Sequence, residues 1–254
     1  MNQRLVVFAL MVLVPVLAGA EGERDLRTVI DWSNWDAILG SHVVDGRVDY
    51  DAIGVDPGFT ATVADIASAD LEGSSPDSVL VFYINAYNVL AVDGILNGRS
   101  PRSSLGKLRF FYRDKHTVAG EALSLHALEN QRIRTLGEPR IHFAIVCASV
   151  SCPPLRSEAY VPQRLDAQLD DNARRFINDP AKNSFEIENS VANVSKIFKW
   201  FSEDFEGAAG DVQRYIADYV DDDRLATSLR EGRFRLRYLD YDWSLNGTFS
   251  RAKR

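Results

Sequence analysis

The segment that most constrains this fold is the apolar run over residues 76–96, which offers almost no polar face. A helix that is apolar nearly all round must be buried inside the protein. Ser75 can cap the N-terminus of such a helix, with Pro76 in its first turn. Asn97 and Gly98 provide a stop signal at the other end. The sequence therefore predicts a central, buried helix over residues 76–96.

Two amide side chains, Asn85 and Asn88, lie three positions apart in this run and so on neighbouring helical rows. A buried amide that lacks hydrogen-bond partners costs about 1–3 kcal/mol. We therefore expect both amides to find partners inside the protein.

Residues 1–20 have the order of a secretory signal peptide, with Arg4 in a short n-region, an apolar run over 5–17 and small residues up to Ala20. The apolar run is shorter than the roughly 20 residues that a membrane-spanning helix needs. An uncleaved membrane anchor is the alternative. We expect cleavage after Ala20, a secreted or periplasmic protein, and no membrane span after cleavage.

Helical and strand patterns alternate along the rest of the chain, and the run over residues 141–147 is the strongest strand pattern because it is short, apolar and β-branched. Residues 102–120 read mainly as a loop. Helices are expected over 32–39, 59–69, 124–135, 162–177 and within 196–229, and further strands near 47–50, 116–118, 184–187, 191–194 and 233–239.

This mixture predicts an α/β or α+β fold, in which the central helix packs against a small mixed sheet. Residues 21–254 are long enough for a single domain, with its core at about 32–247.

Charge and cysteine content narrow the function. The formal net charge is −7, whereas nucleic-acid binding needs clustered Lys and Arg, so nucleic acid is not the expected partner. Cys147 and Cys152 are the only cysteines, too few for a disulfide-built scaffold, so the hydrophobic core must carry the fold.

A polar centre is expected around His142 and Cys152, because a histidine interrupts the apolar run and a loop with both cysteines follows it. Cysteine catalysis needs a thiolate, an imidazole that takes its proton, and a group that orients the imidazole. In a regular strand His142 and Cys147 point to opposite faces, whereas Cys152 lies beyond the turn and can fold back. We therefore predict Cys152 as the reactive thiol, with Ser149, Ser151 and backbone N–H groups as hydrogen-bond donors.

Three alternatives stay open at this point. Cys147 and Cys152 can form a disulfide, which export would permit. His142 can be a core histidine that bonds a backbone carbonyl. The cysteines and His142 can hold zinc, but no fourth ligand follows in a recognisable spacing, so neither a metal nor a cofactor is expected.

Several stretches resemble the domain-of-unknown-function 547 family and occur in the family's order. They are FYINAYN (82–88), SLHALE (124–129), RIHFAIVC (140–147), SCPPL (151–155) and YDWSLN (241–246), together with Trp35 and DGRVDY (45–50). The resemblance covers most of the chain after the predicted signal peptide. It implies a fold distantly similar to papain-like and transglutaminase-like cysteine hydrolases.

Carried over to this sequence, the resemblance implies Cys152 as nucleophile, His142 as base and Glu129 as the carboxylate that orients the imidazole. Asn85 and Asn88 would be buried amides that shape the site. The expected function is an exported cysteine-dependent hydrolase that acts on an amide or ester bond, first of all a peptide bond. The rival hypothesis is a non-catalytic periplasmic binding or envelope-associated domain in which the two cysteines are bridged. The expected partner is accordingly a peptide or an envelope component.

Overall fold

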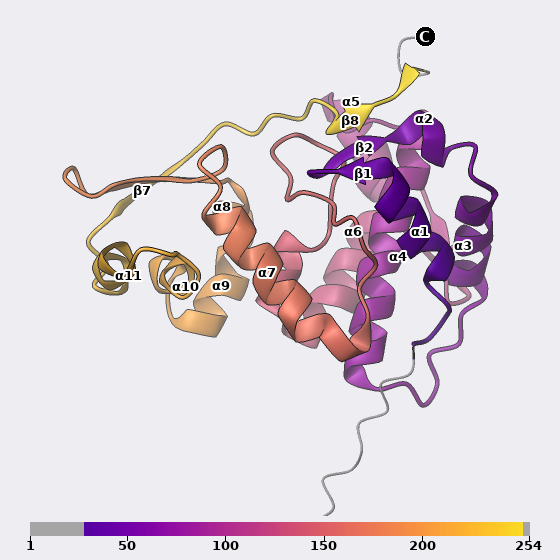
Figure 1. Cartoon of the computed structure of the whole chain (residues 1–254), viewed down its shortest axis with the longest axis horizontal. Coiled ribbons are helices and arrows are strands. Elements are labelled where there is room, and N and C mark those ends of the chain that lie inside the picture. The colour runs from indigo at the N-terminus through magenta and orange to yellow at the C-terminus, as the bar shows by residue number, and fades with distance from the viewer. Residues whose placement is uncertain (1–27, 251–254) are drawn as a thin grey trace, which may run out of the picture.

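The computed structural model describes residues 28–250, and the predicted signal peptide at residues 1–20 lies outside the described residues. Helices and short strands mix in an α+β arrangement, as Figure 1 shows. The predicted α+β character is therefore confirmed.

Helix α4 (Pro76–Leu96) forms where the sequence predicts it. The Ser78 backbone N–H donates to the Ser75 side chain at its N-cap, and most of the helix is buried. Among residues 28–250 it is the one helix with the length and hydropathy of a membrane span, but 83% of its most apolar window is buried inside the protein. That burial is typical of the central helix of a hydrophobic core.

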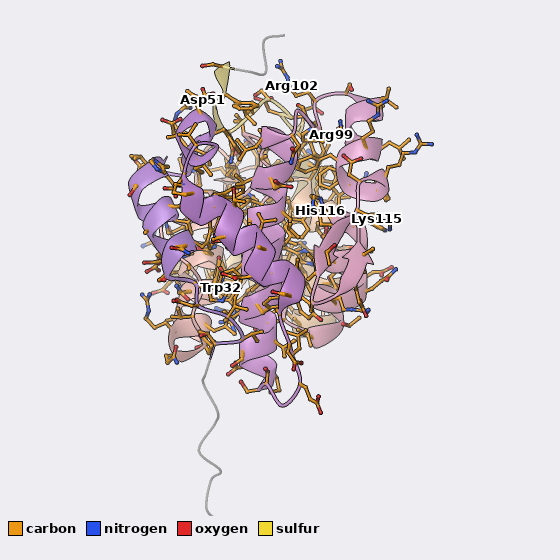
Figure 2. The ribbon with its side chains drawn as sticks, turned by 90° about the vertical axis from the view of Figure 1, so that its right-hand side faces the viewer. Trp32, Asp51, Arg99, Arg102, Lys115 and His116 are labelled. Atoms are coloured by element: carbon orange, nitrogen blue, oxygen red, sulfur yellow. The ribbon has the colours of Figure 1, made fainter. Side chains whose placement is uncertain are left out.

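Short helices cover α4 on the N-terminal side: α1 (Ser33–His42), α2 (Tyr50–Ile53) and α3 (Pro57–Ser68). Figure 2 shows this side of the molecule with Trp32 and His116 labelled. Both contact α4. The Trp32 ring lies 6.1 Å from that of Phe82, and His116 Nδ1 lies 3.8 Å from an Asp93 carboxylate oxygen.

The strands form three separate small sheets within residues 28–250, where the sequence led us to expect one. In the first, β2 (Arg47–Asp49) pairs antiparallel with β1 (Val43–Val44) and parallel with β8 (Gly247–Thr248). The second is the hairpin of β3 (His116–Val118) and β4 (Glu121–Leu123). In the third, β6 (Val191–Val194) pairs antiparallel with β5 (Ser184–Glu186) and parallel with β7 (Arg235–Tyr238).

The remaining helices are short except for α7. The stretch 102–120, expected mainly as a loop, instead contains α5 (Ser104–Lys107) and a π-helical turn, η1 (Leu108–Arg113). The expected helix over 124–135 is divided into α6 (Leu125–Leu128), the π-helical turn η2 (Glu129–Ile133) and the 3-10 turn η3 (Arg134–Leu136). After the 3-10 turn η5 (Pro162–Arg164), the C-terminal part holds α7 (Leu165–Ile177), α8 (Ile197–Trp200), α9 (Ser202–Ala209), α10 (Val212–Ala217) and α11 (Asp223–Arg230).

The strand predicted over residues 141–147 is wrong. A 3-10 helix, η4 (Pro139–Phe143), occupies its first half, with Pro139 in the first turn and the Glu138 side chain accepting the Arg140 N–H at 2.9 Å. The second half is irregular. Its backbone bonds to a side chain on α4, since the Asn88 amide donates to the Ala144 carbonyl. A buried apolar segment needs partners for its backbone, and here an amide supplies them in place of a strand.

The core has two parts that meet near the site. One hydrophobic cluster surrounds α4, and the other gathers around α7, α9 and α10. In Figure 1, α7 lies between the helices of these two halves. Phe143 belongs to the second cluster, whereas Ala144 and Cys152 belong to the first. The segment that carries the candidate site therefore crosses the boundary between the two clusters.

Candidate active site

The two cysteines face each other, with their sulfur atoms 2.7 Å apart and both thiols free. The turn between them begins at Ala148, whose φ of 58° lies in the left-handed region. The Cys152 N–H then donates to the Ser149 carbonyl at 3.1 Å, which closes the turn. The loop thus places the two sulfurs in direct contact.

Cys147 is the thiol that its surroundings activate. Burial raises its pKa, but hydrogen bonds from Cys152, Ser149 and Tyr241 outweigh burial and bring the pKa below its ordinary value. Tyr241 Oη lies 3.2 Å from the Cys147 sulfur and Ser149 Oγ lies 3.1 Å from it. Donors that point at a sulfur stabilise the thiolate over the thiol.

Cys152 has the opposite character. It is buried, and burial together with the hydrogen bond to Cys147 raises its pKa well above the ordinary value. Its S–H therefore serves as a donor to the neighbouring sulfur. The prediction of Cys152 as the reactive thiol relied on strand geometry that is absent here, and the contacts favour Cys147.

His142 is buried and is held by a carboxylate. Its Nε2 lies 2.6 Å from Asp204 Oδ2 at the start of α9, and its ring stacks on Phe201 with the centroids 3.9 Å apart. Burial lowers the pKa of His142, and Asp204 offsets this only in part. When Nε2 carries the proton that it donates to the carboxylate, Nδ1 of the neutral ring is an acceptor. This buried Nδ1 atom has no hydrogen-bond partner among the described residues. His142 can therefore accept a proton at Nδ1.

Asp204 in turn is fixed by Arg134, which reaches both carboxylate oxygens at 2.8 Å. The hydrogen bonds from His142 and Arg134 hold the pKa of Asp204 well below its ordinary value. The group that orients the imidazole is thus Asp204, where the resemblance implied Glu129.

Glu129, at the start of η2, is instead a largely enclosed carboxyl that forms no hydrogen bond with another described residue. Burial raises its pKa to about 7, opposed by the charge of Arg134 and reinforced by Cys147 and Asp204. A carboxyl with such a pKa can give or take a proton near neutral pH.

The remaining predicted site residues have structural positions. Asn85 bonds the backbone of Tyr160 in both directions, at 2.9 and 3.0 Å. Asn88 does the same for Ala144 and Val146, at 3.0 and 2.9 Å. The amides therefore have the buried partners that we expected, and they position the segments on either side of the cysteine loop.

Ser151 likewise binds backbone, because its Oγ accepts the N–H of Asp242 at 2.8 Å. It anchors the C-terminal segment to the loop, and neither sulfur is among its contacts. Ser149 Oγ, by contrast, lies 3.1 Å from the Cys147 sulfur, and their hydrogen bond lowers the pKa of that thiol.

One pocket gathers the reactive groups: Cys147, Cys152, His142 and Glu129 all line a cavity of about 120 Å³. Its other walls are mainly aromatic and aliphatic, namely Tyr87, Phe111, Ile145, Pro153, Ile197, Trp200, Phe201, Tyr241 and Trp243. Residues 28–250 contain no group of three or more His, Cys, Asp or Glu side chains arranged to hold a metal ion.

Sequence reasoning missed Asp204 and Tyr241. They lie 62 and 94 positions after the residues that they contact, His142 and Cys147. A carboxylate in the first turn of a helix is also a common capping feature. Tyr241 belongs to the YDWSLN stretch that supports the family resemblance, which is the one sequence signal that pointed to it.

The fold and the site define an α+β protein with an activated thiol, a second thiol and a carboxylate-bound histidine around one small pocket. Residues 71–177 match the family model described as "Protein of unknown function, DUF547", which supports the resemblance noted in the sequence. Comparison with curated proteins and with solved structures gave no match. The matched segment contains both cysteines, His142 and Glu129, whereas Asp204 and Tyr241 lie beyond it.

Proposed function

We propose that this protein is an exported cysteine-dependent hydrolase that cleaves an amide or ester bond, with Cys147 as its nucleophile. The observation that carries the proposal is the lowered pKa of Cys147 in a pocket that His142 and Glu129 also line. A cysteine reacts as its thiolate, so a pKa near the working pH makes it competent.

The proposed reaction has two stages. The Cys147 thiolate attacks the carbonyl carbon, and the leaving nitrogen or oxygen takes a proton as its bond to carbon breaks. Water then attacks the acyl-cysteine, loses a proton to a base, and releases the acid with the thiolate restored. Glu129 suits the first proton transfer because its pKa of about 7 leaves it partly protonated at neutral pH.

His142 is the proposed base for the water. It is kept neutral by burial and carries an unpartnered acceptor at Nδ1. Asp204 holds the other nitrogen at 2.6 Å, which fixes the tautomer and the ring orientation.

Export is part of the proposal and rests on the signal-peptide pattern of residues 1–20. A peptide or an envelope component is the proposed class of substrate, in keeping with that location and with the papain-like relation that the family resemblance implies.

The test is acyl transfer to the full mature chain from p-nitrophenyl acetate, read by intact mass and peptide mapping. We expect a burst of nitrophenol with one acetyl group on Cys147, and slower deacylation in His142→Gln. The matched control is Cys152→Ser, which keeps a donor and should still be acylated. An acetyl group spread over lysines, with none on Cys147 in the reduced protein, would overturn the proposal.

The contact between the sulfurs supports a second candidate, the non-catalytic domain in which Cys147 and Cys152 are bridged. That candidate predicts a protein two hydrogens lighter than its reduced form when isolated without reductant, as read from intact mass. It also predicts no acylation after reduction, whereas the hydrolase regains acylation once the thiols are free.

A further inference from the structure

The pocket beside Cys147 is small and mostly apolar. Phe111, Ile145 and Ile197 line it together with the rings of Trp200, Tyr241 and Trp243. These rings support one another, since the Tyr241 ring centroid lies 4.7 Å from that of Trp200 and 4.6 Å from that of Trp243. Packed rings of this kind form a wall that holds its shape.

The volume limits what can enter. A cavity of about 120 Å³ is close to the roughly 150 Å³ apolar cavity that is known to bind benzene in an engineered core. A single six-membered ring or a branched side chain of four or five carbons therefore fills it.

Charge limits the occupant further. The acidic groups of the site are Glu129, which lines the pocket, Asp204, which binds His142, and the Cys147 thiolate. The nearby cations are engaged: Arg134 binds both oxygens of Asp204, and Lys107 lies over the Trp243 ring at 3.9 Å. No Lys or Arg among the described residues lines this pocket, so an anionic group inside it would meet repulsion from Glu129 and the thiolate.

We propose that this pocket recognises an uncharged apolar group of the substrate, about the size of a benzyl or isobutyl group, next to the bond that Cys147 attacks. This inference rests on the proposed function and names its substrate class: an acyl compound or peptide with a single small apolar side chain at the reacting carbonyl. Burial of such a group holds the carbonyl near the sulfur, which raises the reaction rate through position.

The test measures alkylation of Cys147 by three probes: iodoacetamide, N-benzyl-iodoacetamide and iodoacetate. In each case the thiolate forms an S–C bond as the C–I bond breaks and iodide leaves. Rates are divided by those of the same probes with N-acetylcysteine at the same pH. We expect the benzyl probe to exceed iodoacetamide by about tenfold in this ratio and iodoacetate to fall below it by about tenfold.

A matched pair of variants locates the effect. Trp200 lines the pocket and is 46% exposed, so Trp200→Ala should fold and should lose most of the benzyl preference. Tyr112 is 52% exposed and lies outside the lining, so Tyr112→Ala should keep the preference.

The outcomes separate the two proposals. Labelling of Cys147 in the proportions shown by N-acetylcysteine, or equal loss of the benzyl preference in both variants, would overturn the pocket assignment and leave the hydrolase standing. No labelling of Cys147 by any probe in the reduced protein would overturn the hydrolase together with the pocket assignment.

Discussion

At the scale of single residues, Cys147 and Cys152 differ in the direction of the hydrogen bonds at their sulfurs. The Cys147 sulfur contacts Ser149, Tyr241 and the Cys152 S–H, whereas the Cys152 sulfur donates to the Cys147 sulfur and accepts the Cys147 backbone N–H. In an asymmetric pair of this kind, the pKa of the accepting thiol falls and the pKa of the donating thiol rises.

The first prediction concerns the pH at which Cys147 reacts. Its pKa is lowered below the ordinary value of a thiol, and the hydrogen bond from the Cys152 S–H is the largest contribution that lowers it. Because Cys152→Ala removes that donor, the midpoint of the alkylation rate against pH should rise by about one pH unit. Val150→Ala changes an exposed side chain of the same loop and should leave the midpoint unchanged. An unchanged midpoint in Cys152→Ala would show that the contact between the sulfurs does not activate Cys147.

The second prediction concerns Glu129 and stability. Burial raises its pKa from 4.5 to about 7, so the folded state holds this proton more tightly than the unfolded state. The carboxyl therefore favours folding fully below pH 4.5, and that contribution is lost as the pH rises through 7. Glu129→Gln has no ionisable carboxyl at this position, so it should not lose this part of the folding stability as the pH rises.

Urea unfolding at pH 5 and pH 8 measures this effect. The free energy of unfolding of Glu129→Gln, relative to the parent, should increase by about 2 kcal/mol between the two pH values. The exposed Glu206→Gln is the control and should show no such difference. A relative stability of Glu129→Gln that is independent of pH contradicts the raised pKa.

At the scale of elements, side chains on α4 form the backbone hydrogen bonds that a neighbouring strand would otherwise form. Asn85 and Asn88 each bind the backbone through both an N–H donor and a carbonyl acceptor, as one strand does for the next. The segment from Ala144 to Val146 therefore needs no sheet, although its composition is that of a strand.

The third prediction follows from this clamp. Asn88→Ala leaves the Ala144 carbonyl and the Val146 N–H buried without partners, so the free energy of unfolding should fall by about 2–4 kcal/mol in urea titrations. Asn97→Ala, at the exposed end of the same helix, should cost less than about 1 kcal/mol. Equal losses in the two variants would mean that the clamp contributes little.

Local patterns predicted the elements whose partners are close in sequence or whose burial is uniform. The apolar run of α4, its Ser75 cap and the amphipathic α7 formed as expected. The strand predicted over residues 141–147 did not form because the segment bonds to a side chain on a helix more than fifty positions earlier. No sequence periodicity reveals that contact. The same holds within the site: Glu129, His142 and the cysteines were predicted from the matched stretches, but their long-range partners were not.

At the scale of the whole molecule, the N-terminal sheet and the C-terminal segment meet near the cysteine loop. Strand β8 pairs in parallel with β2, and Tyr50 Oη donates to Asn246 Oδ1 at 2.6 Å. The segment between Tyr241 and β8 also bonds the loop through the Asn246 N–H and the Ala148 carbonyl at 3.2 Å. The C-terminal segment thus links the N-terminal sheet to the thiol.

The fourth prediction tests this link. A Cβ on Gly247 would lie 1.9 Å from the Val48 carbonyl oxygen, so Gly247→Ala must displace β8 from β2. We expect a loss of about 2 kcal/mol in the free energy of unfolding and a higher alkylation midpoint for Cys147, because Tyr241 shifts with the strand. Gly207→Ala on α9, where a Cβ meets nothing within 4 Å, should be neutral or slightly stabilising. If the alkylation midpoint of Cys147 is unchanged in Gly247→Ala, the position of Tyr241 does not depend on the pairing of β8 with β2.

The late position of Tyr241 has a consequence for the nascent protein. Ribosomes release the N-terminal part of a chain first, and it can begin to fold before the rest is made. The cysteines are therefore complete long before the phenol that helps to ionise one of them, which arrives with the last segment of the described chain. Until that segment docks, Cys147 lacks one of its donors and remains the weaker nucleophile. The order of synthesis itself delays full reactivity until the segment around Tyr241 has been made and has docked.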